Sequence, residues 1–386
     1  MPSSSGWGRM WRSVLPLLGQ SVSIGIWDKP ARSRFRPPPD VWLYDGHQGP
    51  LGVPEPTVIH LQEAPWRLPS TRPLLTARFL ELYEMPSRYA AEAAERIITP
   101  SESSRGQIID EYDVDPAHVL MVPLGVDLAL FRPGRPGAAD VIARAGGDPA
   151  RPYVLYVSTV HPRKNLAALR TAVAGVARRG LPHGLVIAAS PPPDREDYQS
   201  LIEEAGAELP GAPGRVVLLQ KLSDIELAAV MAGATAFCQP SLMEGFGLTT
   251  LEAMACGVPV VVSNRGSLPE VVGDAGVVSE PDGEALESAL YDLLTDSDRM
   301  AKLSRAGLAR SLGYSWHATA EGWLRALHEA VPEPQLGPFE WLLPTSVTQT
   351  LTQGVRVPIH RRKWARDAEQ RLRIIQTPRR VDPPQS

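Results

Sequence analysis

Two glutamates, Glu244 and Glu252, lie on either side of a glycine-rich turn in the second half of the chain. This turn follows the apolar run 234–238 and precedes a predicted helix; its residues are Gly245, Phe246, Gly247 and Leu248. A strand that ends in such a turn and then starts a helix directs free backbone N–H groups and the positive end of the helix dipole at one point. The pattern therefore predicts a phosphate site, where the glycines let the backbone approach bound oxygens.

The separation of the two glutamates indicates that they have different tasks. Glu252 follows Glu244 by eight residues, so a helical path would hold their Cα atoms about 12 Å apart, at about 1.5 Å per residue. A glycosidase needs its two carboxyl groups about 5–9.5 Å apart across one bond. Side chains could narrow the gap, but the spacing favours Glu244 contacting the group beyond the phosphates and Glu252 accepting hydrogen bonds from a ribose.

Two cations, Arg163 and Lys164, follow the predicted strand 153–158 and precede a predicted helix. Open α/β sheets bind ligands in the crevice beyond such strand ends. An arginine fork and a mobile lysine could neutralise a diphosphate leaving group and stabilise the negative charge that grows on it. The alternative is an ordinary cationic surface turn. With two cations available no metal is required, and no cluster of His, Cys or Asp has metal-ligand spacing.

Around these residues the chain resembles the retaining glycosyltransferases of family 4, also called glycosyl transferases group 1. The hallmark of that family is Pro-Ser-x-x-Glu-Gly-Phe-Gly followed by a second Glu, and the stretch 240–252 matches it. Further segments similar to family signatures are 95–105, 122–133, 153–166 and 267–276. The resemblance, which runs from about Gly6 to about Leu327, implies the two-domain GT-B fold. It also implies that Glu244 contacts the transferred sugar and that Glu252 binds ribose.

The resemblance adds a further candidate, His60, at the end of the predicted strand 57–61. Relatives carry a His-Asp pair there that faces the sugar, whereas Leu61 follows His60 in this chain. The partner acid is therefore lost or displaced to Glu63. We expect His60 to act in catalysis; the alternative is a histidine whose polar atoms are satisfied inside the core.

The N-terminal segment holds the residues that the resemblance assigns to an acceptor-side loop, Gly6, Gly8 and Arg9. Related enzymes begin with a strand before this loop, and we expect the first domain to lack that first strand. Either the recorded start lies downstream of the real one, which we favour, or the domain takes a strand from elsewhere. An apolar stripe at helical spacing is formed by Trp7, Trp11, Val14, Leu15 and Leu18. Packing on the sheet is favoured over a membrane-facing acceptor helix.

Alternating apolar runs and helical patterns predict an α/β protein with two Rossmann-like, doubly wound parallel sheets that face a cleft. A stretch at 133–152 is rich in Gly and Pro and indicates the hinge. We expect an acceptor-side domain at 1–136, a donor domain at 137–330 and a basic extension at 331–386. Predicted strands are 22–27, 41–44, 57–61, 96–99, 119–122, 153–158, 185–189, 216–219, 236–239, 258–262 and 276–279.

Two local signals predict helix starts in the donor domain. Asn165 is a plausible N-cap before a run of apolar residues at helical spacing. Ser223-Asp-Ile-Glu226 has the form of a capping box.

Length and composition fit this organisation. The chain of 386 residues can bury two cores, and 43% hydrophobic with 21% charged residues is typical of a globular protein. A net charge of −4 gives no basic field that would indicate nucleic acid. Two cysteines form no disulfide framework, which favours a reducing cytoplasm. With no leader and no apolar run of about 18 residues, we expect a cytoplasmic protein, with peripheral contact at the inner membrane face as an option.

The sequence thus predicts a retaining, metal-independent glycosyltransferase without a cofactor. It would transfer a sugar from a UDP-, GDP- or ADP-linked donor to a hydroxyl of a sugar or lipid-linked acceptor. The resemblance implies reaction on one face of the sugar, with the donor phosphate removing the acceptor proton. A nucleotide-sugar epimerase on the same fold and a catalytically weak, sugar-nucleotide-binding partner subunit are the alternatives. A phosphorylase is disfavoured because no lysine has a context suited to pyridoxal phosphate.

Overall fold

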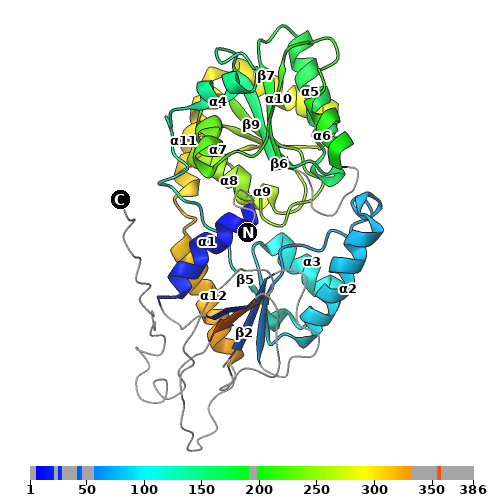
Figure 1. Cartoon of the computed structure of the whole chain (residues 1–386), viewed down its shortest axis with the longest axis vertical. Coiled ribbons are helices and arrows are strands. Elements are labelled where there is room, and N and C mark those ends of the chain that lie inside the picture. Colours follow the sequence, from blue (N-terminus) through cyan, green and yellow to red (C-terminus); the bar gives the residue numbers. More distant parts are fainter. Residues whose placement is uncertain are drawn as a thin grey trace, which may run out of the picture.

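The computed structural model describes residues 6–20, 25–27, 41–45, 56–190, 198–331 and 354–357. In it the chain forms two α/β domains, with helix α1 (Gly6–Leu18) lying between them (Figure 1). Each domain is built on a six-stranded sheet. The predicted architecture of two α/β domains is confirmed.

The second domain contains a fully parallel sheet with strand order β11-β10-β9-β6-β7-β8. Alternate residues of β6 enter two cores, Val154 and Tyr156 on one face and Leu155 and Val157 on the other. Burial on both faces explains why these strands are continuous apolar runs in the sequence. The strands lie within two residues of their predicted bounds: β6 (Tyr153–Thr159), β7 (Gly184–Ser190), β8 (Val216–Leu219), β9 (Ala236–Gln239), β10 (Val260–Ser263) and β11 (Val277–Ser279).

Helices cover both faces of this sheet. Helix α5 (Leu166–Arg178) packs against α10 (Gly283–Thr295), and the apolar side chains of both share one core. Most apolar residues of α7 (Asp224–Ala232) and α8 (Leu248–Ala255) belong to the other core. The remaining helices of this domain are α4 (Ala138–Arg144), α6 (Tyr198–Gly206), α9 (Leu268–Val272) and α11 (Ser297–Ser311). Helix α4 is the short helix within the predicted hinge.

The two predicted helix starts have different outcomes. The capping box is confirmed: the Ser223 hydroxyl accepts from the Glu226 N–H at 3.2 Å, and the Glu226 carboxylate accepts from the Ser223 N–H at 2.9 Å. Asn165 is at the N-cap position of α5, but its side chain does not cap the helix. With φ at 58°, it adopts the left-handed conformation that Asn tolerates, and its amide donates to the carbonyls of Pro240 and Pro281.

The sheet of the first domain has four parallel strands in chain order, β2 (Val41–Asp45), β3 (Thr57–His60), β4 (Arg96–Thr99) and β5 (Val119–Met121). A strand from the predicted C-terminal extension, β12 (Gly354–Val357), pairs antiparallel with β2 and separates it from β1 (Gly25–Trp27). Within the described residues, α1 precedes every strand of this sheet. The start of the predicted strand 22–27 and the rest of the extension 331–386 lie outside the described residues, apart from Val331.

Helices α2 (Ala77–Ala93) and α3 (Glu102–Tyr112) share a core with one face of this sheet. The other face carries α12 (Trp316–Ala330), which contacts β2, β3 and β4. Although α12 falls in the range predicted for the donor domain, the chain returns to the first domain to place it there. Short 3-10 turns at Arg72–Leu74 and Pro116–His118 complete this domain.

The predicted loop conformation of Gly6, Gly8 and Arg9 is corrected, because all three residues belong to helix α1. Their assignment to the acceptor side stays a prediction. The physical reason is the apolar stripe that follows, which gains more by burial as one helical face than as a loop. Trp11 of this stripe packs edge-on against Trp323 of α12, with ring centroids 5.1 Å apart. Trp11, Val14 and Leu18 of the stripe are therefore buried rather than turned outward.

Candidate functional site

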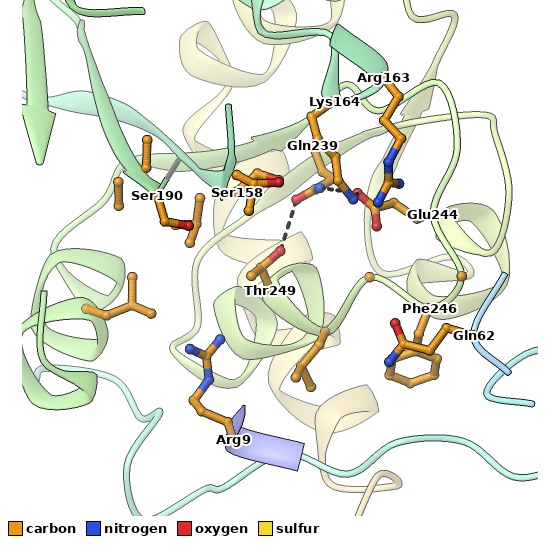
Figure 2. A pocket seen from close by; sticks show the side chains of 18 of the residues that line it. Arg9, Gln62, Ser158, Arg163, Lys164, Ser190, Gln239, Glu244, Phe246 and Thr249 are labelled. Carbon is orange, nitrogen blue, oxygen red and sulfur yellow. Dashed lines mark hydrogen bonds and ion pairs between the residues drawn. The ribbon is translucent and has the colours of Figure 1, made fainter. Parts of the chain in front are cut away.

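A cavity of about 320 Å³ lies between the domains (Figure 2). The second domain lines it with residues from the carboxyl ends of β6, β7, β8 and β9, where open parallel sheets bind ligands. The first domain contributes Arg9, Gln62, Glu63 and Leu124. Predicted site residues that line the cavity are Arg9, Arg163, Lys164, Glu244, Gly245, Phe246, Gly247 and Leu248.

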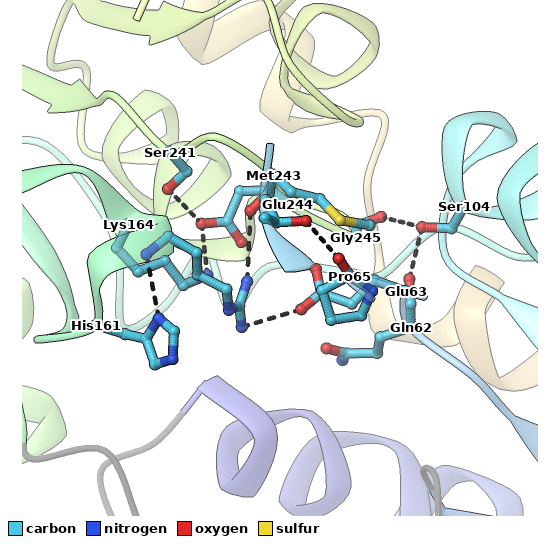
Figure 3. Close-up of polar contacts among 12 residues, drawn as sticks. Gln62, Glu63, Pro65, Ser104, His161, Lys164, Ser241, Met243, Glu244 and Gly245 are labelled. Atoms are coloured by element: carbon cyan, nitrogen blue, oxygen red, sulfur yellow. Dashed lines mark hydrogen bonds and ion pairs between the residues drawn. The ribbon is translucent and has the colours of Figure 1, made fainter. Parts of the chain in front are cut away.

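Glu244 is held by three hydrogen bonds to one of its oxygens. Oε1 accepts from Lys164 Nζ at 2.6 Å, from Gln239 Nε2 at 2.7 Å and from the Ser241 hydroxyl at 2.7 Å. Figure 3 shows Ser241 and Lys164 converging on this carboxylate from two sides. Because all three bonds go to Oε1, the position of the carboxylate is fixed while Oε2 keeps its acceptor sites for a ligand.

The surroundings of Glu244 and Lys164 lower the pKa of both groups. Burial acts to raise the pKa of Glu244, but the positive charges of Lys164 and Arg163 outweigh it and leave that pKa below its ordinary value. Burial lowers the pKa of Lys164, and the neighbouring Arg163 lowers it further, against the pull of Glu244. Glu244 is therefore an anion at neutral pH, and Lys164 loses its proton more easily than an exposed lysine.

Arg163 connects the cations of the second domain to an acid of the first. Its Nη2 atom lies 3.0 Å from Oε1 of Glu63, and Nη1 donates to the Met243 carbonyl at 3.4 Å. Glu63 lines the cavity from the first domain. The acid that the sequence placed at Glu63, as a displaced partner of His60, thus faces the same cavity as Glu244.

Helix α8 points its N-terminus at the cavity, as the glycine turn predicted. Its N-cap residue, Gly247, has φ at 94° and no side chain to cap the helix, so first-turn N–H groups are available to a ligand. Leu248 and Thr249 of this turn line the cavity beside Lys164. The turn supplies donors and a positive dipole end where a phosphate was predicted.

Gly245 has a further role that the sequence did not indicate. A Cβ at this position would lie 2.4 Å from the carbonyl oxygen of Gln62 in the first domain. The Gly245 carbonyl accepts a hydrogen bond from the Ser101 hydroxyl at 2.7 Å. It accepts another from the Ser104 hydroxyl at 2.9 Å (Figure 3). Both serines lie at the start of helix α3, so the glycine turn is one place where the two domains meet.

Glu252 is covered by Arg9 in this structure. Nε and Nη2 of Arg9 donate to the two carboxylate oxygens at 2.8 and 2.9 Å. Burial raises the pKa of Glu252, and Arg9 opposes that rise. Arg9 lines the cavity whereas Glu252 does not, so the predicted ribose acceptor lies directly behind an arginine from the first domain.

His60 lies apart from the cavity. It is fully buried, with its ring centroid 4.9 Å from that of Trp323 in α12, and it does not line the cavity. This position in the core is the one that the alternative expected, and the catalytic role of His60 stays a prediction. Gly6 and Gly8 lie in the first turn of α1, next to Arg9.

Sequence reasoning missed Gln239, whose side chain connects Glu244 to Thr249 in the first turn of α8. The amide of Gln239 donates to Glu244 and accepts from the Thr249 hydroxyl at 3.0 Å. The available signal was a polar residue that ends the apolar strand β9 (Ala236–Gln239), because strand ends of a parallel sheet meet at the ligand-binding edge.

Two general features of the described chain bear on ligand classes. In the ranges that the structure describes, no three His, Cys, Asp or Glu side chains lie close enough together to share a metal ion. None of the helices in these ranges combines the length and apolar character needed to cross a membrane.

Comparison with known proteins relates this geometry to a family. Residues 142–310 match the family model of glycosyl transferases group 1. The D-inositol 3-phosphate glycosyltransferase of Segniliparus rotundus is 32% identical over 249 residues, which cover 64% of this chain and 55% of that protein. The MMP alpha-(1->4)-mannosyltransferase of Mycolicibacterium hassiacum is 33% identical over 273 residues, which cover 69% of this chain and 60% of that protein. The chain therefore spans little more than half the length of these relatives.

Solved structures support the fold independently. The structure of Anabaena HepE in complex with UDP-glucose aligns with a TM-score of 0.60 at 20% identity, covering 71% of this chain and 72% of that one. Sucrose-phosphate synthase from Thermosynechococcus elongatus aligns with a TM-score of 0.57 at 23% identity, covering 71% and 68%. The second domain, which brings Glu244, Arg163 and Lys164 to one cavity, therefore belongs to the glycosyl transferases group 1 family, and the chain has the GT-B fold.

Proposed function

We propose that this protein transfers a sugar, with retention of configuration and without a metal, from a nucleoside-diphosphate sugar to an acceptor hydroxyl. The observation that carries the proposal is the convergence of three features on one cavity. These are the uncapped N-terminus of α8, the cations Arg163 and Lys164, and the fixed carboxylate of Glu244. A diphosphate with a sugar beyond it satisfies all three.

The donor diphosphate is assigned to the N-terminus of α8, beside Lys164 and Arg163. Lys164 uses one N–H for Glu244 at 2.6 Å, which leaves two for phosphate oxygens. Both cations and the helix dipole would stabilise the charge that develops on the leaving phosphate. The free Oε2 of Glu244 would accept from a hydroxyl of the transferred sugar, and Glu252 from the ribose.

The reaction breaks the bond between the sugar C1 and the diphosphate oxygen and forms a bond from C1 to the acceptor oxygen. The leaving diphosphate takes the acceptor proton, as the family resemblance implies. The protein then contributes to catalysis by orienting the substrates and by electrostatic stabilisation, and it forms no covalent bond to the sugar. Glu63, at the cavity wall in the first domain, is the acid closest in sequence to the expected His-Asp position and is assigned to the acceptor side.

The donor is proposed to be UDP-, GDP- or ADP-linked and the acceptor to be a sugar or a lipid-linked glycan. The likeness to Anabaena HepE, whose structure was solved in complex with UDP-glucose, supports a nucleotide-sugar donor. A cytoplasmic location, including a peripheral one at the inner membrane face, would give access to such donors.

Incubation with a panel of UDP-, GDP- and ADP-sugars, with and without candidate acceptors, tests the proposal. We expect acceptor-dependent release of one nucleoside diphosphate and a product whose anomeric configuration by NMR equals that of the donor. Conversion of the donor sugar without an acceptor would identify an epimerase instead. Nucleotide binding without turnover on any acceptor would favour the partner subunit, and a product of opposite configuration would exclude retention.

A further inference from the structure

Arg9 covers the carboxylate that the donor ribose requires, and we propose that Arg9 is itself a donor-binding residue that changes partner when the donor binds. Without donor, its guanidinium holds Glu252. When the ribose takes Glu252, the guanidinium turns to the donor diphosphate. The inference rests on the proposed function, because it takes Glu252 as the ribose acceptor and the N-terminus of α8 as the diphosphate site.

The guanidinium of Arg9 is surrounded by acids of the second domain. Nε and Nη2 form a two-pronged pair with Glu252, and Nη1 lies 3.8 Å from Oδ1 of Asp224. The side chains of Arg9 and Glu252 are 7% and 3% exposed. Both Glu252 oxygens are engaged and screened from the cavity, so a ribose diol can reach them only after the guanidinium moves.

A displaced Arg9 needs another anion. Loss of a buried partner is strongly unfavourable for a charge. The remaining contact, 3.8 Å from Nη1 to Oδ1 of Asp224, is with an acid whose Oδ2 already pairs with Arg12 at 2.7 Å. The donor diphosphate supplies the missing anion. Glu252 follows Leu248, the first residue of α8, by one helical turn, or about 6 Å along the axis. A rotation of the arginine side chain can span this distance while α1 stays in place.

The direction of the Arg9 side chain agrees with this exchange. Figure 2 shows it extending from α1 into the cavity, on the side of α8 that carries Thr249. A bare nucleoside would have to break the pair with Glu252 and would offer Arg9 no anion in return. A nucleoside diphosphate would break the same pair and replace it. Arg9 would therefore select phosphorylated ligands over nucleosides.

Binding measurements on matched ligands test the exchange. Calorimetry would compare UDP with uridine, GDP with guanosine and ADP with adenosine, using the pair that wild type binds best. Arg9→Gln is expected to bind the nucleoside more tightly than wild type does. The ratio of its affinities for the diphosphate and the nucleoside is expected to fall about tenfold or more, as for the loss of one charge-assisted hydrogen bond. Arg12→Gln, one turn further along α1 and paired with the same Asp224, is the control and should change neither value more than about twofold.

Several results would overturn the exchange. Weaker nucleoside binding by Arg9→Gln would mean that Arg9 orients Glu252 for ribose, and an unchanged preference would mean that Arg9 does not meet the diphosphate. If Arg9→Gln unfolds, Arg9→Lys replaces it, because lysine keeps the charge but loses the two-pronged pair with Glu252. A nucleoside affinity of Arg9→Lys no higher than that of wild type would contradict the exchange. Glu252→Gln with wild-type nucleoside affinity would refute the ribose role and the exchange with it, but not the diphosphate site. No diphosphate binding by wild type would refute the proposed function as well.

Discussion

Gly245 of the second domain lies so close to Gln62 of the first that a Cβ on the glycine would be 2.4 Å from the Gln62 carbonyl oxygen. The Gln62 oxygen is a backbone atom, and the position of a Cβ is fixed by the backbone. Neither atom could therefore move aside without a shift of the backbone. The site is therefore assembled where the two domains approach each other, and this turn is one of their closest contacts.

Gly245→Ala is expected to force the domains apart and to lower turnover at least tenfold, with little loss of stability in the second domain. Turnover and small-angle scattering would measure the two effects. Gly106→Ala in α3 is the control, because a Cβ there meets nothing within 4 Å and alanine favours a helix by about 1 kcal/mol. Wild-type turnover in Gly245→Ala would show that the contact is dispensable.

We expect turnover to fall at alkaline pH as Lys164 loses its proton. Burial lowers its pKa below the ordinary value of 10.5, and transfer requires its charge, so turnover should decline with a midpoint below 10.5. Between the lowered pKa and 10.5, the unfolded chain binds more protons than the folded one. The contribution of this group to stability therefore rises with pH in that window, and the decline of turnover should not coincide with unfolding. Loss of turnover in step with loss of structure would contradict this account.

Gln239→Leu is expected to lower turnover without weakening nucleotide binding to the same degree. The substitution removes the amide that ties Glu244 to Thr249, so the carboxylate is no longer fixed against the sugar, while Lys164 still neutralises it. Steady-state kinetics should show a fall in kcat of about tenfold or more, with the nucleotide Kd changed about twofold or less. Thr249→Ser, which keeps a hydroxyl for Gln239, serves as the matched control. Equal losses in kcat and in affinity would argue against a positioning role.

His60→Ala is expected to destabilise the first domain and to leave the turnover of folded molecules intact. The ring is buried against Trp323, and removal of a large buried side chain usually costs about 2–5 kcal/mol. Thermal unfolding and turnover normalised to folded protein would separate the effects. A stable variant that has lost turnover would restore the catalytic assignment of His60.

The second domain could be predicted closely because its signals are local. Strands such as β9 (Ala236–Gln239) are apolar on both faces, and the capping box at Ser223 uses residues three apart. The glycine turn and the cations Arg163 and Lys164 follow strand ends, which a parallel sheet necessarily brings to one edge. Spacing along the chain was enough to place them at one site.

The contacts that close the site could not be predicted in this way. Arg9 and Glu252 are separated by 243 positions, and nothing local to either residue indicates the other. The return of α12 to the first domain likewise depends on packing between Trp11 and Trp323, which no periodicity specifies. His60 was assigned by resemblance, and the packing of α12 against its strand placed it inside the core.

Lys164 and the N-terminus of α8 are expected to hold the diphosphate of a nucleotide donor, and every other assignment at the cavity depends on this one. Calorimetric titration of UDP, GDP and ADP into wild type and Lys164→Met tests it most directly, because methionine keeps the apolar stem and removes the charge. Thermal unfolding would confirm that the variant is folded. We predict that wild type binds at least one of the three and that Lys164→Met binds it about 10- to 150-fold more weakly, as expected for loss of a charged hydrogen bond worth about 1.5–3 kcal/mol. Equal affinity in the two proteins would contradict the assignment of this cavity to the donor.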